Sequence, residues 1–441
     1  MRERKVDVAR LNVPNWFGPA PAALERDAVV VALRAPLSPR DMDKTQPGRN
    51  GWRYSSQASS ILVEAVSHQV AATHFVAWTD LLQRLIEPNV FLDPCFVLPA
   101  VQHFAMARRP AFVLVWDESE GERHKLIGLC PVMLPRPHFG GTTATAWLHE
   151  HASVGMPLID RAQAIETLDL IVDWLGREHP HLTGLMIPKL RREGPMLALL
   201  RARAIMSGRD IRLFGEHERA MLPGGGPGRQ AEENVFSPKK LKELRRQRRR
   251  LADTGKLVYS SARTPAEVRE ATERFLALEA AGWKGRRGTA LLSDPGLTTF
   301  TRAMTRLLAR DGICRIDTLE VDGKAVGMGI VLHSGGYGYL WKIAYDEAFR
   351  AASPGVQFVL DLTKAQLEKE GIVFTDSCAI PDHPMIDHVW RERLAIADAL
   401  VSIRPAASRR FALSAAGETA RRGLKSMLKA AYYRASGRKK V

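Results

Sequence analysis

Residues 313–376 constrain the fold more than any other part of the chain. This stretch reads as three short strands joined by the turn pairs Asp322-Gly323 and Gly335-Gly336, then a helix, then a further strand at 372–375. Both pairs suit two-residue hairpin turns, because those turns need residues that adopt a positive φ. The pattern therefore predicts an antiparallel meander of strands that leads directly into a helix.

The helix begins at the run Arg350-Ala351-Ala352-Ser353-Pro354-Gly355. We expect Ser353 to cap the helix, Pro354 to occupy its first turn, and Gly355 to keep the approach to the backbone open. Free N–H groups at a helix start, beside an arginine, form a site for an anionic phosphate group. An ordinary capped helix is the alternative, and the hairpins before the run favour the phosphate site.

The run at 350–355 resembles the R/Q-x-x-G-x-G/A pyrophosphate loop of the GNAT acyltransferase superfamily, with Ser353 in place of the first glycine. More specifically, four motifs in order resemble the CelD/BcsL-type acetyltransferases, which are associated with cellulose and other exopolysaccharide production in bacteria. These motifs are Gly282-Trp283-Lys284-Gly285-Arg286, Tyr345-Asp346-Glu347, Ser353-Pro354-Gly355 and Asp376-Ser377-Cys378. The resemblance covers residues 231–405 well and residues 61–222 weakly.

The resemblance implies an acyl-CoA co-substrate, acetyl-CoA first of all, and no metal ion. It also implies that the strand at 337–345 splays from its neighbour, so that backbone N–H groups on it can polarise the thioester carbonyl. The residues expected to bind the co-substrate are Ile343, Ala344, Tyr345, Arg350, Ala351, Ala352, Ser353, Gly355 and Val356.

Three side chains are candidates for the proton transfer that acyl transfer needs: Glu279, His383 and Asp376. Glu279 lies near the apolar stripe of its helix, where a carboxylate can act as a base; an ion pair with Lys284 or Arg286 is equally favoured. Imidazole titrates near neutrality, so His383 can take a proton, although a capping role is commoner for a histidine in such a turn. Asp376 is expected at a strand end facing the cleft, with helix capping as its alternative.

Trp283, Lys284 and Trp341 are the candidates for contact with the acceptor. Trp283 can pack against a sugar ring or can simply anchor its loop. Trp341 belongs to the alternating aromatic series Tyr337, Tyr339, Trp341 and Tyr345, a pattern more typical of packing than of recognition. Gly327 and Gly329, on the strand before, leave room for a close neighbour, which a closely packed helix would explain equally well.

A chain of 441 residues suits two or three domains. The predicted fold class is α/β (α+β), with two tandem GNAT-like lobes, each a mixed, mostly antiparallel sheet flanked by helices. The predicted divisions are a loose segment at 1–60, a degenerate lobe at 61–222, a Gly/Pro linker at 223–230, a catalytic lobe at 231–405 and a basic tail at 406–441. Only the second lobe carries a phosphate loop, so the first is expected to serve as a scaffold and as part of the acceptor cleft. Near the end of the second lobe, Pro384 is expected to open a helix that runs to about Arg393, capped by Asp382.

The net charge of +16 predicts an anionic binding partner but does not identify which one. The basic run 239–250 is read first as a charged helix joining the lobes, and the lack of interleaved aromatic residues leaves no strong case for nucleic acid. The basic C-terminal run can rest on an anionic membrane surface, with an unstructured tail as an equal alternative. Scattered cysteines and a charged N-terminus predict a cytoplasmic protein, with a peripheral position at the inner face of the membrane as the second expectation.

The sequence thus predicts an acyl-CoA-dependent N- or O-acyltransferase, with an acetyl group as the expected cargo. Transfer is expected to be direct, because no cysteine or serine stands in a nucleophile arrangement. The resemblance implies a glycan or envelope-precursor acceptor linked to exopolysaccharide or cell-envelope synthesis. The alternatives are a Fem-type transferase that uses aminoacyl-tRNA, and a non-catalytic component that binds CoA or glycan.

Overall fold

The structure, a computed structural model, describes residues 43–48, 51–55, 60–104, 106, 108–119, 125–135, 142–225, 236–405 and 409–435. Up to the Gly/Pro run, its elements are β1 (Asp43–Gly48), β2 (Gly51–Ser55), β3 (Ser60–Val66), α2 (His68–Thr73), α3 (Phe75–Leu82), η2 (Val90–Leu92), α4 (Pro94–His103), β4 (Ala111–Asp117), β5 (Lys125–Met133), β6 (Thr143–Ala146), β7 (Leu158–Ile159), η4 (Arg161–Gln163), α5 (Ala164–Glu178), β8 (Gly184–Arg191), α6 (Pro195–Ser207) and β9 (Ile211–Pro223). After it come α7 (Pro238–Ala252), β10 (Leu257–Ala262), α8 (Pro265–Ala281), α9 (Trp283–Arg286), η5 (Leu291–Ser293), α10 (Pro295–Arg310), β11 (Cys314–Val321), β12 (Lys324–Ser334), β13 (Tyr337–Tyr345), η6 (Glu347–Ala352), α11 (Pro354–Leu367), β14 (Phe374–Asp376), η7 (Ile386–His388), β15 (Glu392–Ser402) and α12 (Arg409–Ala435).

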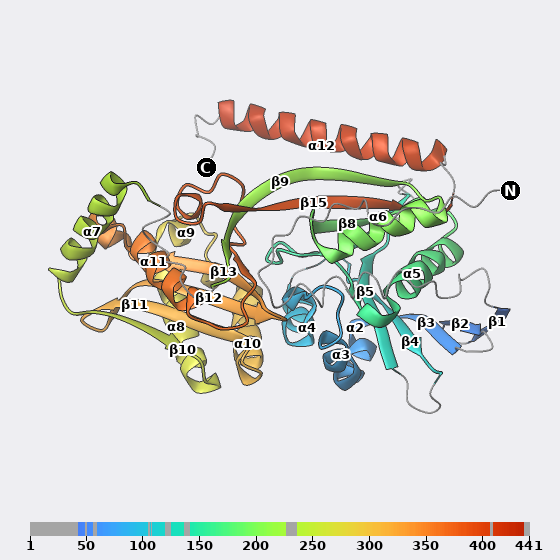
Figure 1. Ribbon diagram of the computed structural model, residues 1–441, viewed down its shortest axis with the longest axis horizontal. Helices are drawn as coiled ribbons and strands as arrows, with labels where there is room; N and C mark the ends of the chain where they lie inside the picture. Colours follow the sequence, from blue (N-terminus) through green and yellow to red (C-terminus); the bar gives the residue numbers. More distant parts are fainter. Residues whose placement is uncertain are drawn as a thin grey trace.

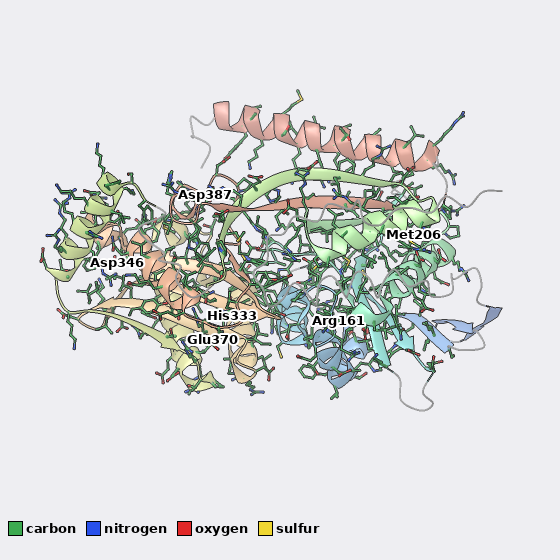
Figure 2. All side chains as sticks on the ribbon, in the orientation of Figure 1. Arg161, Met206, His333, Asp346, Glu370 and Asp387 are labelled. Atoms are coloured by element: carbon green, nitrogen blue, oxygen red, sulfur yellow. The ribbon has the colours of Figure 1, made fainter. Side chains whose placement is uncertain are left out.

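One continuous sheet runs through both halves of the molecule (Figure 1). Its strand order is β1-β2-β3-β4-β5-β6-β8-β15-β9-β14-β13-β12-β11-β10, with β7 beside β5. The two halves repeat one arrangement: β6 is parallel to β8, as β13 is parallel to β14, and all other pairs are antiparallel. The prediction of two tandem, mixed and mostly antiparallel lobes flanked by helices is confirmed, with the addition that the lobes share one sheet.

The halves are joined by an exchange of their last strands. Strand β15, from the second half, pairs with β8 of the first half, and β9, from the first half, pairs with β14 of the second. β9 and β15 also pair with each other over most of their length. Because each half completes the sheet of the other, the predicted divisions at 222 and 405 do not separate two independent sheets.

The two predicted hairpin turns have the expected backbone. Asp322 and Gly323 have φ values of 46° and 77°, and Gly335 and Gly336 have values of 50° and 83°. Two positive φ values in succession are what a type I′ turn requires, and this turn matches the twist of the strands that it joins. The meander β11-β12-β13 follows from these turns and brings the chain to α11.

Three local predictions are wrong. Within the segment predicted to be loose, β1 and β2 pair with each other and with β3 and so extend the sheet; the rest of 1–59 lies outside the described residues. The helix predicted from Pro384 is only the short η7, because β15 already begins at Glu392 and Asp382 has a φ of 56°. The third is the unstructured alternative for the basic tail, because residues 409–435 form the long helix α12, which lies along β9 and β15 (Figure 1).

The linker predicted at 223–230 begins as a packed segment. The Gly224 N–H donates to the Val373 carbonyl, which continues the pairing of β9 with β14. A Cβ on Gly224 would meet the Ile372 carbonyl at 1.8 Å, so only glycine fits at this position. Residues 226–235 lie outside the described residues.

Gly327 and Gly329 make room for α11. A Cβ on either residue would lie 2.7 Å from the Phe358 side chain, which is fully buried against them. The closely packed helix is therefore the explanation for this glycine pair. The contact fixes α11 over β12 and so fixes where the helix begins.

Ser353 does not cap α11. Its backbone is left-handed, with φ of 50° and ψ of 57°, and its side chain makes no capping hydrogen bond. This is the position at which the resembled loop has its first glycine, and glycine adopts the left-handed region without the steric cost that a Cβ brings. The loop thus keeps the conformation of the glycine pattern with a residue that is strained in it.

We expect Ser353→Gly to raise the free energy of unfolding by about 1 kcal/mol, because it removes the contact between Cβ and carbonyl oxygen in the left-handed region. Urea unfolding measures the change. Ser353→Ala is the matched control, since it deletes the hydroxyl and keeps the Cβ, and it should give no gain. An equal gain from alanine would assign the effect to the hydroxyl and contradict the conformational account.

Candidate functional site

The donor loop, residues 350–356, lies where η6 meets α11. Arg350 and Ala351 are exposed, Ser353 and Val356 are partly exposed, and Ala352, Pro354 and Gly355 are buried. A Cβ on Gly355 would come within 2.8 Å of the Tyr345 ring and 3.0 Å of Met385 Sδ, so this side of the helix start is packed. The Arg350 side of the loop faces solvent and is the side that can receive an anion.

Two cavities lie beside α7: the first lies between α7 and α11, and the second is lined by α7 and Phe236. Their volumes are about 170 Å³ and 520 Å³, and Phe236, Leu241 and Arg245 line both. Neither is lined by a residue of the donor loop. The donor loop is therefore a surface site and does not line either cavity.

Strand β13 parts from β14 after Tyr339, and its unpaired stretch ends at Tyr345, which contacts Gly355 of the donor loop. The two strands pair only at Tyr337, Gly338 and Tyr339, although β13 continues to Tyr345. Beyond Tyr339, no described strand lies along this edge of β13, which leaves the edge open to a ligand. This splay is what the resemblance implies, and a backbone edge of this kind suits an extended amide chain such as the pantetheine arm.

A β-bulge marks the point of parting. The register between β12 and β13 shifts between Leu340 and Lys342, which leaves Trp341 as the extra residue. A bulge of this kind turns successive side chains to one face of the sheet. Trp341 packs in the core on the α8 and α10 side together with Ala344, whereas Ile343 packs in the core under α11. The predicted aromatic series is therefore broken, and Tyr345 contacts Gly355 of the donor loop instead.

Glu279 and Lys284 form the ion pair that the sequence left open. Lys284 Nζ lies 2.6 Å from Glu279 Oε1, and the Leu291 N–H donates to Glu279 Oε2 at 2.8 Å. Both oxygens of this buried carboxylate are therefore engaged. Lys284 Nζ also lies 3.5 Å from the Ile343 carbonyl, which places it at the edge of β13. In this geometry Glu279 positions Lys284 and is not poised as a free base.

Lys342 is a side chain of the candidate site that the sequence did not predict. Its Nζ lies 3.1 Å from Nδ1 of His151, in the other half of the chain, and the Trp341 indole donates to the His151 carbonyl at 2.7 Å. Burial and the positive charge of Lys284 lower the pKa of Lys342 to about 8. Burial and the charges of Lys342 and Lys284 lower the pKa of His151 to about 4. A lysine in an otherwise aromatic and aliphatic strand was the signal that could have found it.

Asp376 takes part in a buried ion pair with Arg219, so it neither caps a helix nor lies free in a cleft. Its other oxygen accepts a hydrogen bond from the Cys378 N–H. Arg219 lies on β9, so this pair ties the exchanged strand to β14. Removing one partner of such a pair leaves a buried charge, at a cost of about 3–5 kcal/mol.

His383 and Trp283 lie at the rim of the same region. The N–H groups of Met385 and Ile386 approach His383 Nδ1 at 3.2 and 3.4 Å, so the ring caps its turn, and burial lowers its pKa. Trp283 is 39% exposed, and its N–H donates to Glu347 beside the donor loop. Trp283 is thus open to a ligand, whereas Trp341 is buried between the two halves against Phe96 and Phe300.

Cys378 is the thiol of this region, and its environment keeps it protonated. Burial, together with the nearby Asp376 carboxylate, raises the pKa of Cys378 to about 12. The thiolate is the nucleophilic form of cysteine, so a covalent acyl-enzyme at Cys378 is disfavoured. The geometry favours direct attack by an acceptor. Within the described ranges, no group of three or more His, Cys, Asp or Glu residues is placed to hold a metal ion.

We expect Lys342→Met to be more stable than the wild type at pH 7, by about 2 kcal/mol. The folded chain binds this proton less tightly than the unfolded chain, whose lysine titrates near pH 10.4, so the unfolded state holds more protons between about pH 8 and 10.4. The free energy of unfolding of the wild type therefore rises as the pH rises through that window. The stability difference between Lys342→Met and the wild type should shrink accordingly. Urea unfolding at pH 7 and pH 10 tests this, with the exposed Lys239→Met as the control for loss of one charge. A difference that is the same at both pH values would contradict the lowered pKa.

Comparison with known proteins assigns part of the chain to a family. Residues 238–376 match the family model described as Acetyltransferase (GNAT) domain. This match begins at α7 and ends with β14, so it contains the donor loop and the splayed strand. No curated protein matches the chain.

Several solved structures match the chain at low sequence identity and with TM-scores below 0.5. One, described as the C-terminal domain of a lysylphosphatidylglycerol synthetase from Agrobacterium fabrum, is 11% identical with a TM-score of 0.47 and covers 80% of this chain and 97% of its own. FemX is 12% identical with a TM-score of 0.47, over 76% of this chain and 96% of its own. A tandem GNAT protein from the clavulanic acid biosynthesis pathway is 16% identical with a TM-score of 0.36, over 79% and 100%. The family match alone identifies residues 238–376 as an acetyltransferase (GNAT) domain, and this domain supports an acyltransferase activity.

Proposed function

We propose that the chain is an acyl-CoA-dependent N- or O-acetyltransferase of the CelD/BcsL type. Its acceptor would be an amine or hydroxyl of a glycan or envelope precursor linked to exopolysaccharide or cell-envelope synthesis. The observation that carries the proposal is the parting of β13 from β14 after Tyr339, directly beside the exposed Arg350 of the donor loop. A free backbone edge and a cationic helix start are the two features needed to hold a thioester on a diphosphate-bearing arm.

Each part of the site has a role in this proposal. Arg350 and the start of α11 hold the diphosphate, and the edge N–H groups at 343–345 hold the pantetheine arm and polarise the thioester carbonyl. The acceptor approaches from the α8 and α9 side of the sheet, where Trp283 and Lys284 lie. Its nucleophile attacks the carbonyl carbon, the carbon–sulfur bond breaks, and the CoA thiolate leaves.

Lys342 is the side chain best suited to take the acceptor proton. It follows the bulge, lies one residue before the thioester-binding edge, and has a pKa of about 8 because of burial and Lys284. A base works best when its pKa is near the operating pH. Glu279 is then a positioning residue, which holds Lys284 beside Lys342; Lys284 lowers the pKa of Lys342, and the charge of Glu279 offsets part of that effect.

We expect the wild type to bind acetyl-CoA and Arg350→Ala to bind it about tenfold more weakly, a loss of about 1.4 kcal/mol for one charge-assisted contact with phosphate. Isothermal titration calorimetry measures both affinities. Arg269→Ala, an exposed arginine on α8 away from the loop, should leave the affinity unchanged.

Failure of the wild type to bind acetyl-CoA would contradict the proposal. Transfer from aminoacyl-tRNA in its place would favour the Fem-type alternative. Binding of acetyl-CoA without release of free CoA across a panel of acceptors would favour the non-catalytic alternative.

We further propose that the enzyme works in the cytoplasm, at the inner face of the membrane, with α12 as its contact. Among the described residues, no helix is long and apolar enough to cross a bilayer. Phe411 and Ala415 of α12 are buried, whereas the face turned away from the sheet carries exposed Leu413, Leu424 and Leu428 at helical spacing. Arginines and lysines flank this stripe, and Glu418 is the acidic residue of the helix. An apolar stripe with a basic rim suits an anionic lipid surface.

We expect binding to phosphatidylglycerol vesicles and none to neutral phosphatidylcholine vesicles in a sedimentation assay. Leu424→Glu combined with Leu428→Glu should reduce binding at least tenfold, because it places charge in the apolar stripe. Ile205→Glu, an equally exposed apolar residue on α6, is the control. Unchanged vesicle binding by the double variant would contradict a lipid contact. So would a wild-type dimer that dissociates in the double variant, because the stripe would then be a protein interface.

A further inference from the structure

Three consecutive residues of the first half each hold a cation from a different element. His151 Nδ1 lies 3.1 Å from Lys342 Nζ on β13, the Ala152 carbonyl accepts from Lys189 Nζ on β8 at 2.8 Å, and the Ser153 carbonyl accepts from Arg219 on β9 at 3.1 Å. Because consecutive residues are only about 3.8 Å apart, the three cationic groups are gathered in one small region. We call residues 151–153 with these three side chains the cationic seam.

Three carboxylates around the cationic seam are already engaged, and exposed Glu150 is a further carboxylate whose charge acts on Lys342. Glu279 is paired with Lys284 and the Leu291 N–H, and Asp376 with Arg219 and the Cys378 N–H. Asp398 is paired with Arg422 and accepts from the Lys189 backbone N–H. In the described part of the chain, neither Lys342 nor Lys189 has a carboxylate within 4.0 Å. The seam therefore holds more positive charge than its own carboxylates neutralise.

The buried polar atoms without a partner in this region are all donors. His151 Nδ1 faces the Lys342 ammonium and His149 Nδ1 lies 3.2 Å from the His151 N–H, so in each ring the hydrogen is on Nε2. Both Nε2 atoms and Arg219 Nε are buried and have no hydrogen-bond partner. Exposed Glu150 approaches His151 Nε2 at 3.4 Å without forming a hydrogen bond. Donors left unpaired away from water cost free energy, which an acceptor atom of a ligand would offset.

We propose that the cationic seam binds an anionic group, a carboxylate or a phosphate, carried by the acceptor next to its reactive amine or hydroxyl. This inference rests on the proposed function, because it takes the α8 and α9 side of β13 as the acceptor side. Lys342, Lys189 and His151 are partly exposed, which opens the seam to a ligand from that side. In this arrangement the Lys189 ammonium binds the anionic group. Lys342 then takes the proton of the acceptor's nucleophile. Burial and the positive charge of Arg219 lower the pKa of Lys189, and the nearby Asp398 and Asp376 carboxylates offset part of that shift.

The test compares amino sugars that share one amine and differ by an added anionic group, with the enzyme saturated with acetyl-CoA. Glucosamine is neutral apart from its amine, glucosamine 6-phosphate adds a phosphate, and muramic acid adds a carboxylate. Calorimetry should show at least one charged sugar binding tenfold or more tightly than glucosamine. Which of the two binds tighter identifies the anion as phosphate or carboxylate.

Substitution of Lys189 localises the effect. Lys189→Met should weaken binding of the preferred charged sugar about tenfold, Lys189→Arg should restore most of it, and the exposed Lys240→Met on α7 should change nothing. A second measurement on the wild type avoids any folding defect: the bound sugar should protect Lys342 and Lys189 from acetic anhydride at pH 8, as read by mass spectrometry.

Equal affinity for charged and neutral sugars, or no affinity and no protection by either charged one, would overturn the inference while acetyl-CoA binding still supports the transferase. Absence of acetyl-CoA binding would instead overturn the proposed function, whatever the sugars do.

Discussion

The exchange of β9 and β15 is the constraint on which the rest of the structure depends. A strand from each half completes the sheet of the other half, so the halves cannot separate without breaking main-chain pairing. The buried ion pair between Arg219 and Asp376 lies at this junction and fixes β9 beside the short strand β14. Because β14 ends at Asp376, β13 pairs with no described strand on that edge beyond Tyr339, while its other edge stays paired with β12; the open edge of the site follows from the junction.

Because of the bulge at Trp341, side chains of the candidate site lie on both faces of β13. One face of β13 carries Tyr345, which packs against the helix start of the donor loop. The other face carries Trp341 and Lys342, which reach across to His151 in the first half. A regular strand would turn only one of these two adjacent side chains to that face. The bulge is thus the reason that donor and acceptor chemistry can meet on one strand.

The sequence was sufficient where local chemistry decides the structure. Turn pairs, helix starts and the apolar periodicity predicted the meander, the helix after it and the mixed sheets of both halves, because each depends on residues close together in the chain. The sequence was insufficient where contacts between distant segments decide the structure. The left-handed Ser353 was mistaken for a cap because a serine before a proline normally is one. Lys342 was overlooked because its importance comes from His151, which is 191 residues away in the chain.

The roles proposed for Lys342 and Lys189 differ because their surroundings differ. Burial and Lys284 lower the pKa of Lys342 to about 8, and its Nζ contacts His151, so its neutral form is accessible near pH 8. Burial and Arg219 also lower the pKa of Lys189, while Asp398 and Asp376 offset part of that shift. A base must be able to lose its proton, whereas an anion-binding group must keep it. Neither lysine could take its role in one half alone, since Lys342 needs the desolvating contact with residues 149–153 and Lys189 needs the carboxylates of β14 and β15.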